Sequence, residues 1–177
     1  MKSVFLNLGC GFNKLPEMVN VDAYDVCNPD VVCDLNKFPY PWDDNSVDGI
    51  VAYHIFEHLI DWWPAFLECA RILKPGGTLE IRVPDESSAT ALTYRDHHHV
   101  FGLVSFHGAL DSHHGTNAWA KTVAESVPMK MISYNQVPFK EYNWMFRVPW
   151  LLRFCARHLR NFIHEQSFLF CKIGVQK

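Results

Sequence analysis

The amino-acid sequence predicts an α/β fold, in which the strands of a largely parallel sheet alternate with helices. Short apolar runs, each ending in a glycine turn or an acidic residue, recur along residues 4–53. A helical apolar pattern and a strictly alternating strand pattern follow them between residues 61 and 83. The chain has 177 residues, of which 49% are apolar and 14% aromatic, so it can form one domain with a sizeable core.

The first part of the sequence is expected to form four buried strands, because each is a short apolar run that stops at turn residues. They are residues 4–8 before the Gly9-Cys10-Gly11 turn, residues 18–21 before Asp22, residues 31–33 before Asp34, and residues 47–53. About ten residues, among them Pro16, separate the first two strands. A crossover helix hardly fits into that length, so we expect a turn there instead.

The rest of the chain is expected to add a helix and three more strands. The helix is predicted to begin at Asp61, which can cap it, and to end at the Lys-Pro-Gly-Gly sequence of residues 74–77. Alternation in residues 78–83 predicts a strand with Glu80 and Arg82 on a thinly covered face. The remaining predictions are strands at residues 129–135 and 166–175, an amphipathic helix at residues 149–163, and an irregular segment at residues 84–128.

Composition narrows the class of protein. No apolar run approaches the roughly 20 residues that span a bilayer, and residues 1–8 do not resemble a secretory signal. Six cysteines are scattered without a C-x-x-C pair, which favours a reducing cytoplasm over a disulfide or zinc scaffold. Residues 1–70 carry eleven acidic and three basic residues, which suits a cationic small ligand, although ordinary surface charge explains the same pattern.

The glycine turn and two carboxylates mark a candidate ligand site. In an open parallel sheet, ligands bind beyond the carboxyl ends of the strands, where glycines allow close approach of the backbone. The third glycine of the dinucleotide fingerprint is missing here, which disfavours an NAD enzyme and allows a ligand without phosphates. Asp22 can bind both hydroxyls of a ribose. Asp34 can accept a hydrogen bond from an adenine amine, with the Leu35 amide nearby.

Four stretches of the sequence resemble class I S-adenosylmethionine-dependent methyltransferases, most closely the small methyltransferase-domain proteins of the type 11-like family. They read LNLGCGFNKLPEMVNVD, VVCDL, FPYPWDDNSVDGIVAYHIFEHL and ARILKPGGTLEIRVPD, and they lie in family order between residues 6 and 85. The resemblance implies a Rossmann-like three-layer sandwich with a mostly parallel seven-stranded sheet and an antiparallel last strand. The layer of N-terminal helices is expected to be reduced.

The resemblance also implies a cofactor, S-adenosyl-L-methionine, and a site for it. The residues implied to bind it are Leu8, Gly9, Cys10, Gly11, Asp22, Asp34, Leu35, Tyr53 and His54. A hydroxyl acceptor needs a base to remove its proton, and histidine suits that role at neutral pH. The candidates are His54, His98 and His99, the last two from the predicted acceptor or lid segment at residues 84–128.

One domain is expected over residues 1–177, with residues 1–83 binding the cofactor and residues 129–177 completing the sheet. The predicted function is methyl transfer to a small-molecule or saccharide acceptor. One alternative is a catalytically degenerate cofactor-binding module that acts with a partner. Another is a zinc hydrolase, because His54, Glu57 and His58 match the H-x-x-E-H pattern.

The sequence is compatible with several partners and binding surfaces. A homodimer partner or residues 84–128 can close the cofactor pocket. The histidines at 97–99, 107, 113 and 114 can bind metal, bind acceptor or form polar loop. Trp62, Trp63 and the aromatic residues at 144, 146 and 150 can stack on a sugar or lie at a membrane surface beside the 149–163 helix. The sequence has no dense patch of lysine and arginine that would indicate binding of nucleic acid.

Overall fold

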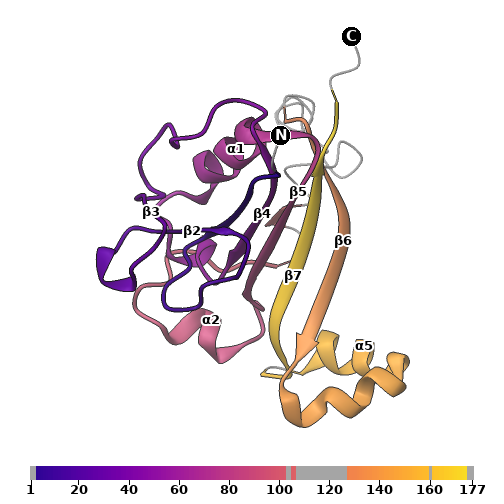
Figure 1. The fold of residues 1–177 in the computed structure, drawn as a ribbon. Helices are drawn as coiled ribbons and strands as arrows, with labels where there is room; N and C mark the ends of the chain where they lie inside the picture. The colour runs from indigo at the N-terminus through magenta and orange to yellow at the C-terminus, as the bar shows by residue number, and fades with distance from the viewer. Residues whose placement is uncertain (1–2, 103–104, 107–126, 160, 175–177) are drawn as a thin grey trace.

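The computed structural model describes residues 3–102, 105–106, 127–159 and 161–174, and its centre is one seven-stranded sheet (Figure 1). The strand order is β3-β2-β1-β4-β5-β7-β6. Strands β1 to β5 are parallel, and β7 is antiparallel to both of its neighbours. The strands are β1 (Phe5–Leu8), β2 (Val19–Asp22), β3 (Val31–Val32), β4 (Val47–Tyr53), β5 (Leu73–Pro84), β6 (Met129–Pro138) and β7 (Ile163–Lys172).

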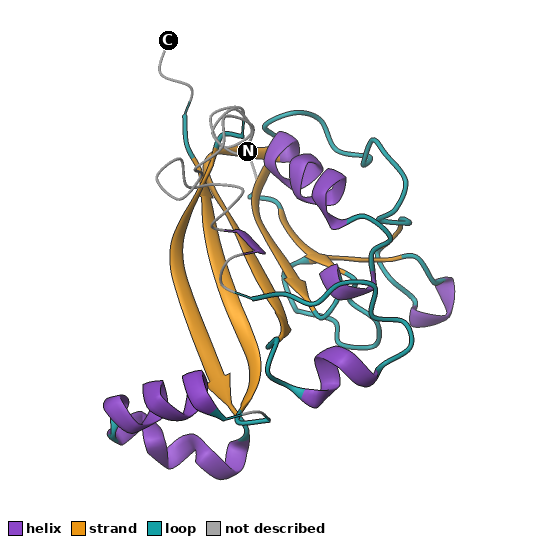
Figure 2. Ribbon diagram, turned by 180° about the vertical axis from the view of Figure 1, so that it is seen from behind, coloured by secondary structure: helices purple, strands orange, loops and turns teal. Residues whose placement is uncertain are grey.

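Short helices lie on one side of this sheet and beyond one end of the β6–β7 hairpin in the described part of the chain (Figure 2). The α-helices are α1 (Trp62–Ile72), α2 (Ala89–Thr93) and α5 (Pro149–His158), and the 3-10 helices are η1 (Asp25–Cys27), η2 (Phe56–His58) and η3 (Lys140–Arg147). Asp61 caps α1 as expected, because its side chain accepts a hydrogen bond from the Trp63 amide. Among the described helices, none has the length and apolar character needed to cross a bilayer.

The main core lies on one face of the sheet, beneath α1. Leu79, Ile81 and Val83 of β5 are fully buried there, and Phe66 of α1 contacts Phe170 of β7 with ring centroids 5.2 Å apart. Burial of each such side chain contributes about 1.5–3 kcal/mol. The aromatic core therefore joins α1 to the C-terminal hairpin of β6 and β7. The described phenylalanines of this core that are at most 1% exposed are Phe56, Phe66, Phe101, Phe106, Phe168 and Phe170.

The opposite face of the sheet is thinly covered, as the alternation of β5 predicts. The side chains of Glu80 and Arg82 on that face are 26% and 40% exposed. Residues 9–18 form only turns, and the Leu15 amide donates to Asn20 Oδ1, which ties this connection to β2. The predicted Rossmann-like fold and seven-stranded sheet are confirmed, and the helix between β1 and β2 is reduced to a turn.

Some predicted elements have different limits in the structure. The strand expected at residues 78–83 begins at Leu73, so the Lys-Pro-Gly-Gly sequence lies inside β5 and α1 ends before it. The strand expected at residues 129–135 continues to Pro138. The predicted helix at residues 149–163 is too long, because α5 ends at His158 and Ile163 already pairs with Pro138 in the sheet.

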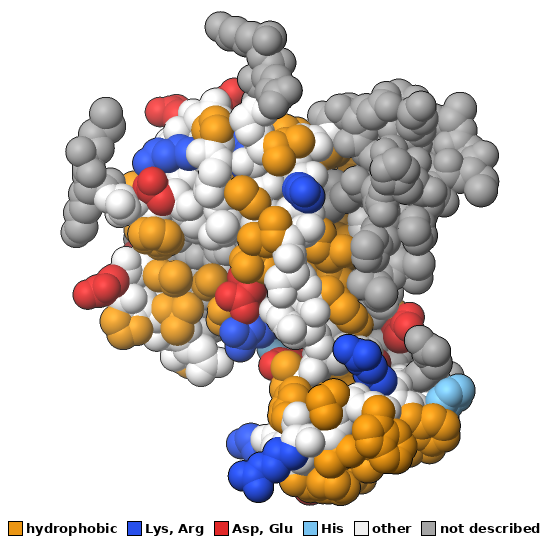
Figure 3. All heavy atoms as spheres, turned by 90° about the vertical axis from the view of Figure 1, so that its right-hand side faces the viewer, with side chains coloured by type: hydrophobic (Ala, Val, Ile, Leu, Met, Phe, Trp, Pro, Cys, Tyr) orange, Lys and Arg blue, Asp and Glu red, His pale blue; other side chains and the backbone are white. Residues whose placement is uncertain are grey.

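Two groups of tryptophans have different surroundings. Trp62 packs into the core against Phe101 and Phe106, with ring centroids 5.5 and 5.1 Å apart, and also contacts Trp63. Both tryptophans are half-buried, and stacking of Trp62 and Trp63 on a sugar stays a prediction. Around α5 and η3, in contrast, aromatic side chains and arginines share one surface, visible at the bottom of Figure 3. Its exposed aromatic residues are Trp144, Phe146, Trp150 and Phe154, and membrane contact there stays a prediction.

Candidate cofactor and active site

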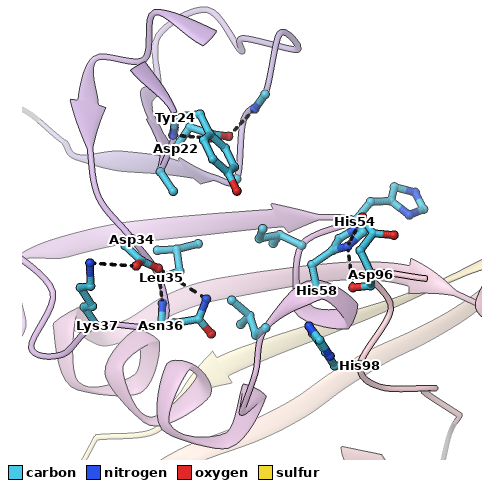
Figure 4. A pocket seen from close by; sticks show the side chains of 15 residues that line it. Asp22, Tyr24, Asp34, Leu35, Asn36, Lys37, His54, His58, Asp96 and His98 are labelled. Carbon is cyan, nitrogen blue, oxygen red and sulfur yellow. Dashed lines mark hydrogen bonds and ion pairs between the residues drawn. The ribbon is translucent and has the colours of Figure 1, made fainter. Parts of the chain in front are cut away.

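A cavity of about 710 Å³ opens at the carboxyl ends of β1, β2 and β4 (Figure 4). This is the place where open α/β sheets bind ligands, and the volume lies within the range of small-molecule sites. Asp96 and His98 also contribute to the wall. The lining residues are Gly9, Gly11, Asp22, Ala23, Tyr24, Asp34, Leu35, Asn36, Lys37, His54, Ile55, His58, Leu59, Asp96 and His98.

The turn after β1 brings backbone to the cavity wall. Gly9 and Gly11 have φ angles of 65° and 49°, a left-handed conformation that glycine adopts without the steric cost of a Cβ atom. A Cβ atom on Gly9 would lie 2.6 Å from Cγ1 of Ile55, whereas one on Gly11 would meet nothing within 4 Å. The Cys10 amide donates to the Val21 carbonyl oxygen at 3.0 Å and ties the turn to β2.

Asp22 is held at the edge of the cavity by two backbone amides. Its Oδ2 accepts a hydrogen bond from the Gly11 amide at 2.8 Å, and its Oδ1 accepts one from the Tyr24 amide at 3.0 Å. The residue is only 8% exposed. A carboxylate offers about four acceptor positions, so both oxygens can still accept a hydrogen bond from a ligand hydroxyl.

Asp34 follows β3 and lies at another part of the same wall. The Asn36 amide donates to its Oδ1 at 3.0 Å, and Lys37 Nζ lies 3.2 Å from its Oδ2. These groups hold the pKa of Asp34 below its usual value, the Asn36 hydrogen bond having the largest effect. Leu35 is buried beside it, and the Tyr40 hydroxyl donates to the Leu35 carbonyl oxygen at 2.9 Å.

His54 follows β4 in a left-handed conformation, with φ of 53°. Its Nε2 lies 2.9 Å from Glu165 Oε2, and its Nδ1 lies 3.3 Å from Glu57 Oε1. The hydrogen bond to Glu165, followed by the contact with Glu57, raises the pKa of His54 to about 9 despite its partial burial. A protonated imidazole has no free lone pair, so these contacts disfavour His54 as a base at neutral pH.

Four predicted site residues do not line the cavity. The side chains of Leu8 and Cys10 are 1% and 3% exposed and lie in the core. Tyr53 lies on the opposite face of the sheet, because successive strand residues alternate; its hydroxyl donates to Glu80 Oε2 at 3.0 Å. His99 Nε2 contacts the Ile60 carbonyl oxygen at 3.1 Å. The roles expected of these four residues toward the cofactor or acceptor therefore stay predictions, without support from the lining of this cavity.

His98 does reach the cavity, together with Asp96, which the sequence did not single out. The His98 amide donates to the Glu57 carbonyl oxygen at 2.7 Å, which fixes this stretch against η2. His98 and Asp96 are the part of the 84–128 segment that lines the cavity in the described residues, and closure of the pocket by this segment or by a homodimer partner stays a prediction. Tyr24 and Asn36 were also missed, and their only signal is that each follows a predicted carboxylate by two residues. The histidines at 107, 113 and 114 lie outside the described residues.

A second cavity of about 330 Å³ adjoins the first. Both are lined by His54, His58 and Asp96, so the two spaces meet at these side chains. The other residues that line the second cavity are Glu57, Pro84, Thr90, Tyr94, His97 and His164.

The zinc-peptidase interpretation of H-x-x-E-H does not agree with the local backbone. That pattern needs one helix to bring two histidines four residues apart onto the same face. Here His54 lies in a left-handed bend before a 3-10 turn of three residues, Phe56–His58.

Comparisons with known proteins agree with this geometry. Residues 6–81 match a family model described as a methyltransferase domain. No curated protein sequence matches the chain. Three similar structures, all with low sequence identity, support the same fold.

One of these is an S-adenosylmethionine-dependent methyltransferase from Archaeoglobus fulgidus, with a TM-score of 0.62, 15% identity and coverage of 96% of this chain and 86% of the other. A second is such a methyltransferase from Mesorhizobium loti, with a TM-score of 0.60, 11% identity and coverage of 96% and 90%. A third comes from the Haloferax volcanii complex of the Trm112 methyltransferase activator with a putative methyltransferase, with a TM-score of 0.59, 15% identity and coverage of 97% and 83%.

These comparisons agree with three features of the structure: the glycine turn, the carboxylates after β2 and β3, and the order of the seven strands. Residues 6–81 thus match the methyltransferase domain, and the chain has the fold of the S-adenosylmethionine-dependent methyltransferases to which it is similar.

Proposed function

We propose that the protein transfers the methyl group of S-adenosylmethionine to a small-molecule or saccharide acceptor. The observation that carries this proposal is the junction of two cavities at His54, His58 and Asp96. The larger cavity has the carboxylates that suit a nucleoside, and the smaller one offers space for a second molecule. Transfer between two bound molecules requires such adjacent sites.

The residues around the larger cavity fit the cofactor. Asp22 has free acceptor capacity on both oxygens for the two ribose hydroxyls, and its position is fixed by the Gly11 and Tyr24 amides. Asp34 is anionic and can accept a hydrogen bond from the adenine amine, beside the apolar side chain of Leu35. When bound, the cofactor supplies a methyl group already activated by its sulfonium, so the protein mainly orients the reactants and excludes water.

The second cavity is the proposed acceptor site. Thr90 and Tyr94 offer hydroxyl groups there, and His164 offers an imidazole, which suits a polar acceptor. His54, held between two carboxylates, supplies positive charge where the cavities meet. Of the three predicted bases, His98 is the one that reaches the cofactor cavity without a carboxylate contact in the described residues.

Substitution of Asp22 tests the cofactor half of this proposal. We expect Asp22→Ala to weaken the binding of S-adenosylhomocysteine by roughly 10- to 100-fold, because each lost hydrogen bond to a charged group costs about 1.5–3 kcal/mol. Asp22→Asn keeps the shape and removes the charge, so it should also bind weakly. Isothermal titration calorimetry measures both dissociation constants.

The matched control is Asp25→Ala, which removes an exposed carboxylate three residues away. Unchanged affinity in both Asp22 variants would contradict the assignment of Asp22 as the ribose ligand. Mass spectrometry of a metabolite and oligosaccharide mixture, incubated with protein and isotope-labelled cofactor, then tests methyl transfer. Tight cofactor binding without any labelled product would favour the alternative, a binding module that acts with a partner.

A further inference from the structure

We propose that Glu57, His58 and His97 bind one divalent transition-metal cation beside the junction of the two cavities. The three residues come from η2 and from the segment after α2, and they have no assigned role in cofactor binding. One ligand atom of each side chain, a carboxylate oxygen or a ring nitrogen, lies within 4.8 Å of the other two. The proposed metal site does not depend on the proposed methyl transfer.

Glu57 provides the strongest independent evidence for a missing partner. It is only 1% exposed, and neither of its carboxylate oxygens has a hydrogen-bond partner among the described residues. Nδ1 of His97 is also buried without a partner. Because burial of an unsatisfied carboxylate is costly, buried carboxylates are paired or bind metal. A cation between Glu57 and His97 would satisfy both groups at once.

His54 compensates part of the negative charge of the Glu57 carboxylate, but not all of it. Its Nδ1 lies 3.3 Å from Glu57 Oε1, close enough for attraction but without hydrogen-bond geometry. Its stronger contact is with Glu165 Oε2 at 2.9 Å. Oε2 of Glu57 and Nδ1 of His97 therefore still lack partners, and these are atoms of two of the three proposed metal ligands.

The surroundings of the ligands are also ordered in the way that metal sites require. His58 Nδ1 lies 3.1 Å from the Asp96 carbonyl oxygen and 3.2 Å from its Oδ2. A histidine ligand commonly donates its other ring N–H to such an oxygen, which fixes the tautomer and leaves Nε2 with a lone pair. The amides of His98 and His99 donate to the Glu57 carbonyl oxygen at 2.7 and 3.3 Å, which holds the segment of His97 against η2.

The donor set indicates the class of metal. Two imidazoles and one carboxylate suit Zn²⁺, Mn²⁺ or Fe²⁺, whereas Mg²⁺ and Ca²⁺ prefer oxygen ligands. Three protein ligands leave at least one coordination position open. Both Glu57 and His97 line the second cavity, and His58 lines both cavities. If the proposed methyl transfer is correct, that open position would hold an acceptor oxygen near the methyl donor.

Metal titration of the full chain tests this site without any assay of methyl transfer. Protein stripped with a chelator is titrated with Zn²⁺ and, separately, with Mn²⁺ by calorimetry, and Co²⁺ binding is followed by visible absorption. We expect one equivalent per chain in the wild type. Glu57→Gln and His97→Ala should each lower the affinity for the metal. The decrease should exceed roughly 10- to 100-fold, which is the loss when a residue that hydrogen-bonds to a metal ligand is removed.

The matched control is His99→Ala, which removes an imidazole two residues from His97 that faces the Ile60 carbonyl oxygen. Its affinity for the metal should equal that of the wild type. Thermal melting and S-adenosylhomocysteine binding show whether each variant is folded. His97→Ala alters a half-buried side chain, so it keeps the test informative if the variant of the buried Glu57 does not fold.

Two results would overturn the proposal: a wild type that binds no equivalent of these metals, or one whose binding survives both Glu57→Gln and His97→Ala. Either result leaves cofactor binding intact and so does not affect the proposed methyl transfer. A wild type that binds the metal but does not bind S-adenosylhomocysteine would refute the proposed function without contradicting the metal site.

Discussion

Gly9 and Gly11 show how two glycines in one turn carry different constraints. Both have positive φ angles, which cost other residues about 1–2 kcal/mol. Only Gly9 is also closely packed, because the side chain of Ile55 occupies the space beside it. Gly11 instead borders open space and directs its amide to Asp22. The first glycine is therefore required by packing and conformation, and the second by conformation alone.

Paired alanine substitutions separate these two effects. Gly11→Ala should lower the free energy of unfolding by about 1–2 kcal/mol, the cost of the left-handed conformation. Gly9→Ala should lower it further, since a crowded core site adds about 1–3 kcal/mol. Urea denaturation followed by circular dichroism gives both values. Equal losses in the two variants would show that Ile55 moves aside without cost.

Individual site residues could be predicted from the sequence where a strand end fixed their position. Asp22 and Asp34 both line the cavity because parallel strands bring their carboxyl ends to one edge. The family resemblance implied a role for Tyr53, but strand alternation places its side chain on the face of Glu80. The raised pKa of His54 depends on Glu165, which is 111 residues away in the sequence, and no local pattern indicates that contact.

At the scale of elements, α1 also anchors the loop that precedes β4. Arg71 donates from Nε and Nη2 to the two carboxylate oxygens of Glu68, each at 2.8 Å, and Glu68 Oε2 accepts a hydrogen bond from the Tyr40 amide. Arg71 also donates to the carbonyl oxygens of Trp42 and Tyr40. The helix thus holds residues 40–42 next to the wall of the cofactor cavity at Leu35.

This anchor predicts a pH-dependent contribution to stability. The hydrogen bond from Arg71 lowers the pKa of Glu68 below its usual 4.5. A lowered pKa in the folded state stabilises the protein above the unfolded value, and the effect is lost as the pH falls through the folded value. Glu68→Gln should therefore reduce the free energy of unfolding by about 1–3 kcal/mol at pH 7, and by less below about pH 4.

Urea denaturation from pH 3 to pH 7 measures that difference. The control is Glu141→Gln, which alters an exposed glutamate in η3 and should leave stability unchanged at every pH. A constant difference between wild type and Glu68→Gln across the range would contradict the ion-pair explanation, because packing alone does not titrate.

The limits of the elements followed the sequence where a cap or an alternation marked them. Asp61 set the start of α1, and β4 has the predicted limits. The end of α5 was missed because the apolar spacing continues to Phe162. That residue packs on Met145 and Cys155 in a small cluster, but it reaches them from the turn before β7. Helical spacing alone does not distinguish these two ways of burying a side chain.

Across the whole molecule, the pairing of β5 with β7 joins the parallel strands β1 to β5 to the C-terminal hairpin of β6 and β7. They pair over seven residues in each strand, from Thr78 opposite Cys171 to Pro84 opposite Glu165. Lys172 at the end of β7 donates from Nζ to Asn45 Oδ1 and to the Leu73 carbonyl oxygen, at 2.8 and 2.7 Å. Its burial lowers the pKa of Lys172.

We therefore predict that the chain unfolds as one cooperative unit. Far-UV circular dichroism and tryptophan fluorescence should give the same urea midpoint, because tryptophans lie in both halves of the chain. Lys172→Met should shift both midpoints together to lower urea, since it removes the hydrogen bonds from Nζ to Asn45 and to the buried Leu73 carbonyl oxygen. Two separate midpoints would show that the β6–β7 hairpin folds apart from the rest.

The sequence by itself determined the class of fold, the order of the strands along the chain and the two carboxylates that line the larger cavity. These features depend on local periodicity and on the residue types at strand ends. Both can be recognised from residues that are neighbours in the chain. Only the tertiary structure decided that Glu57, His58 and His97 meet, that Glu165 holds His54, and that Trp62 belongs to the core. These contacts join segments far apart in the sequence, so they depend on packing that no local pattern contains.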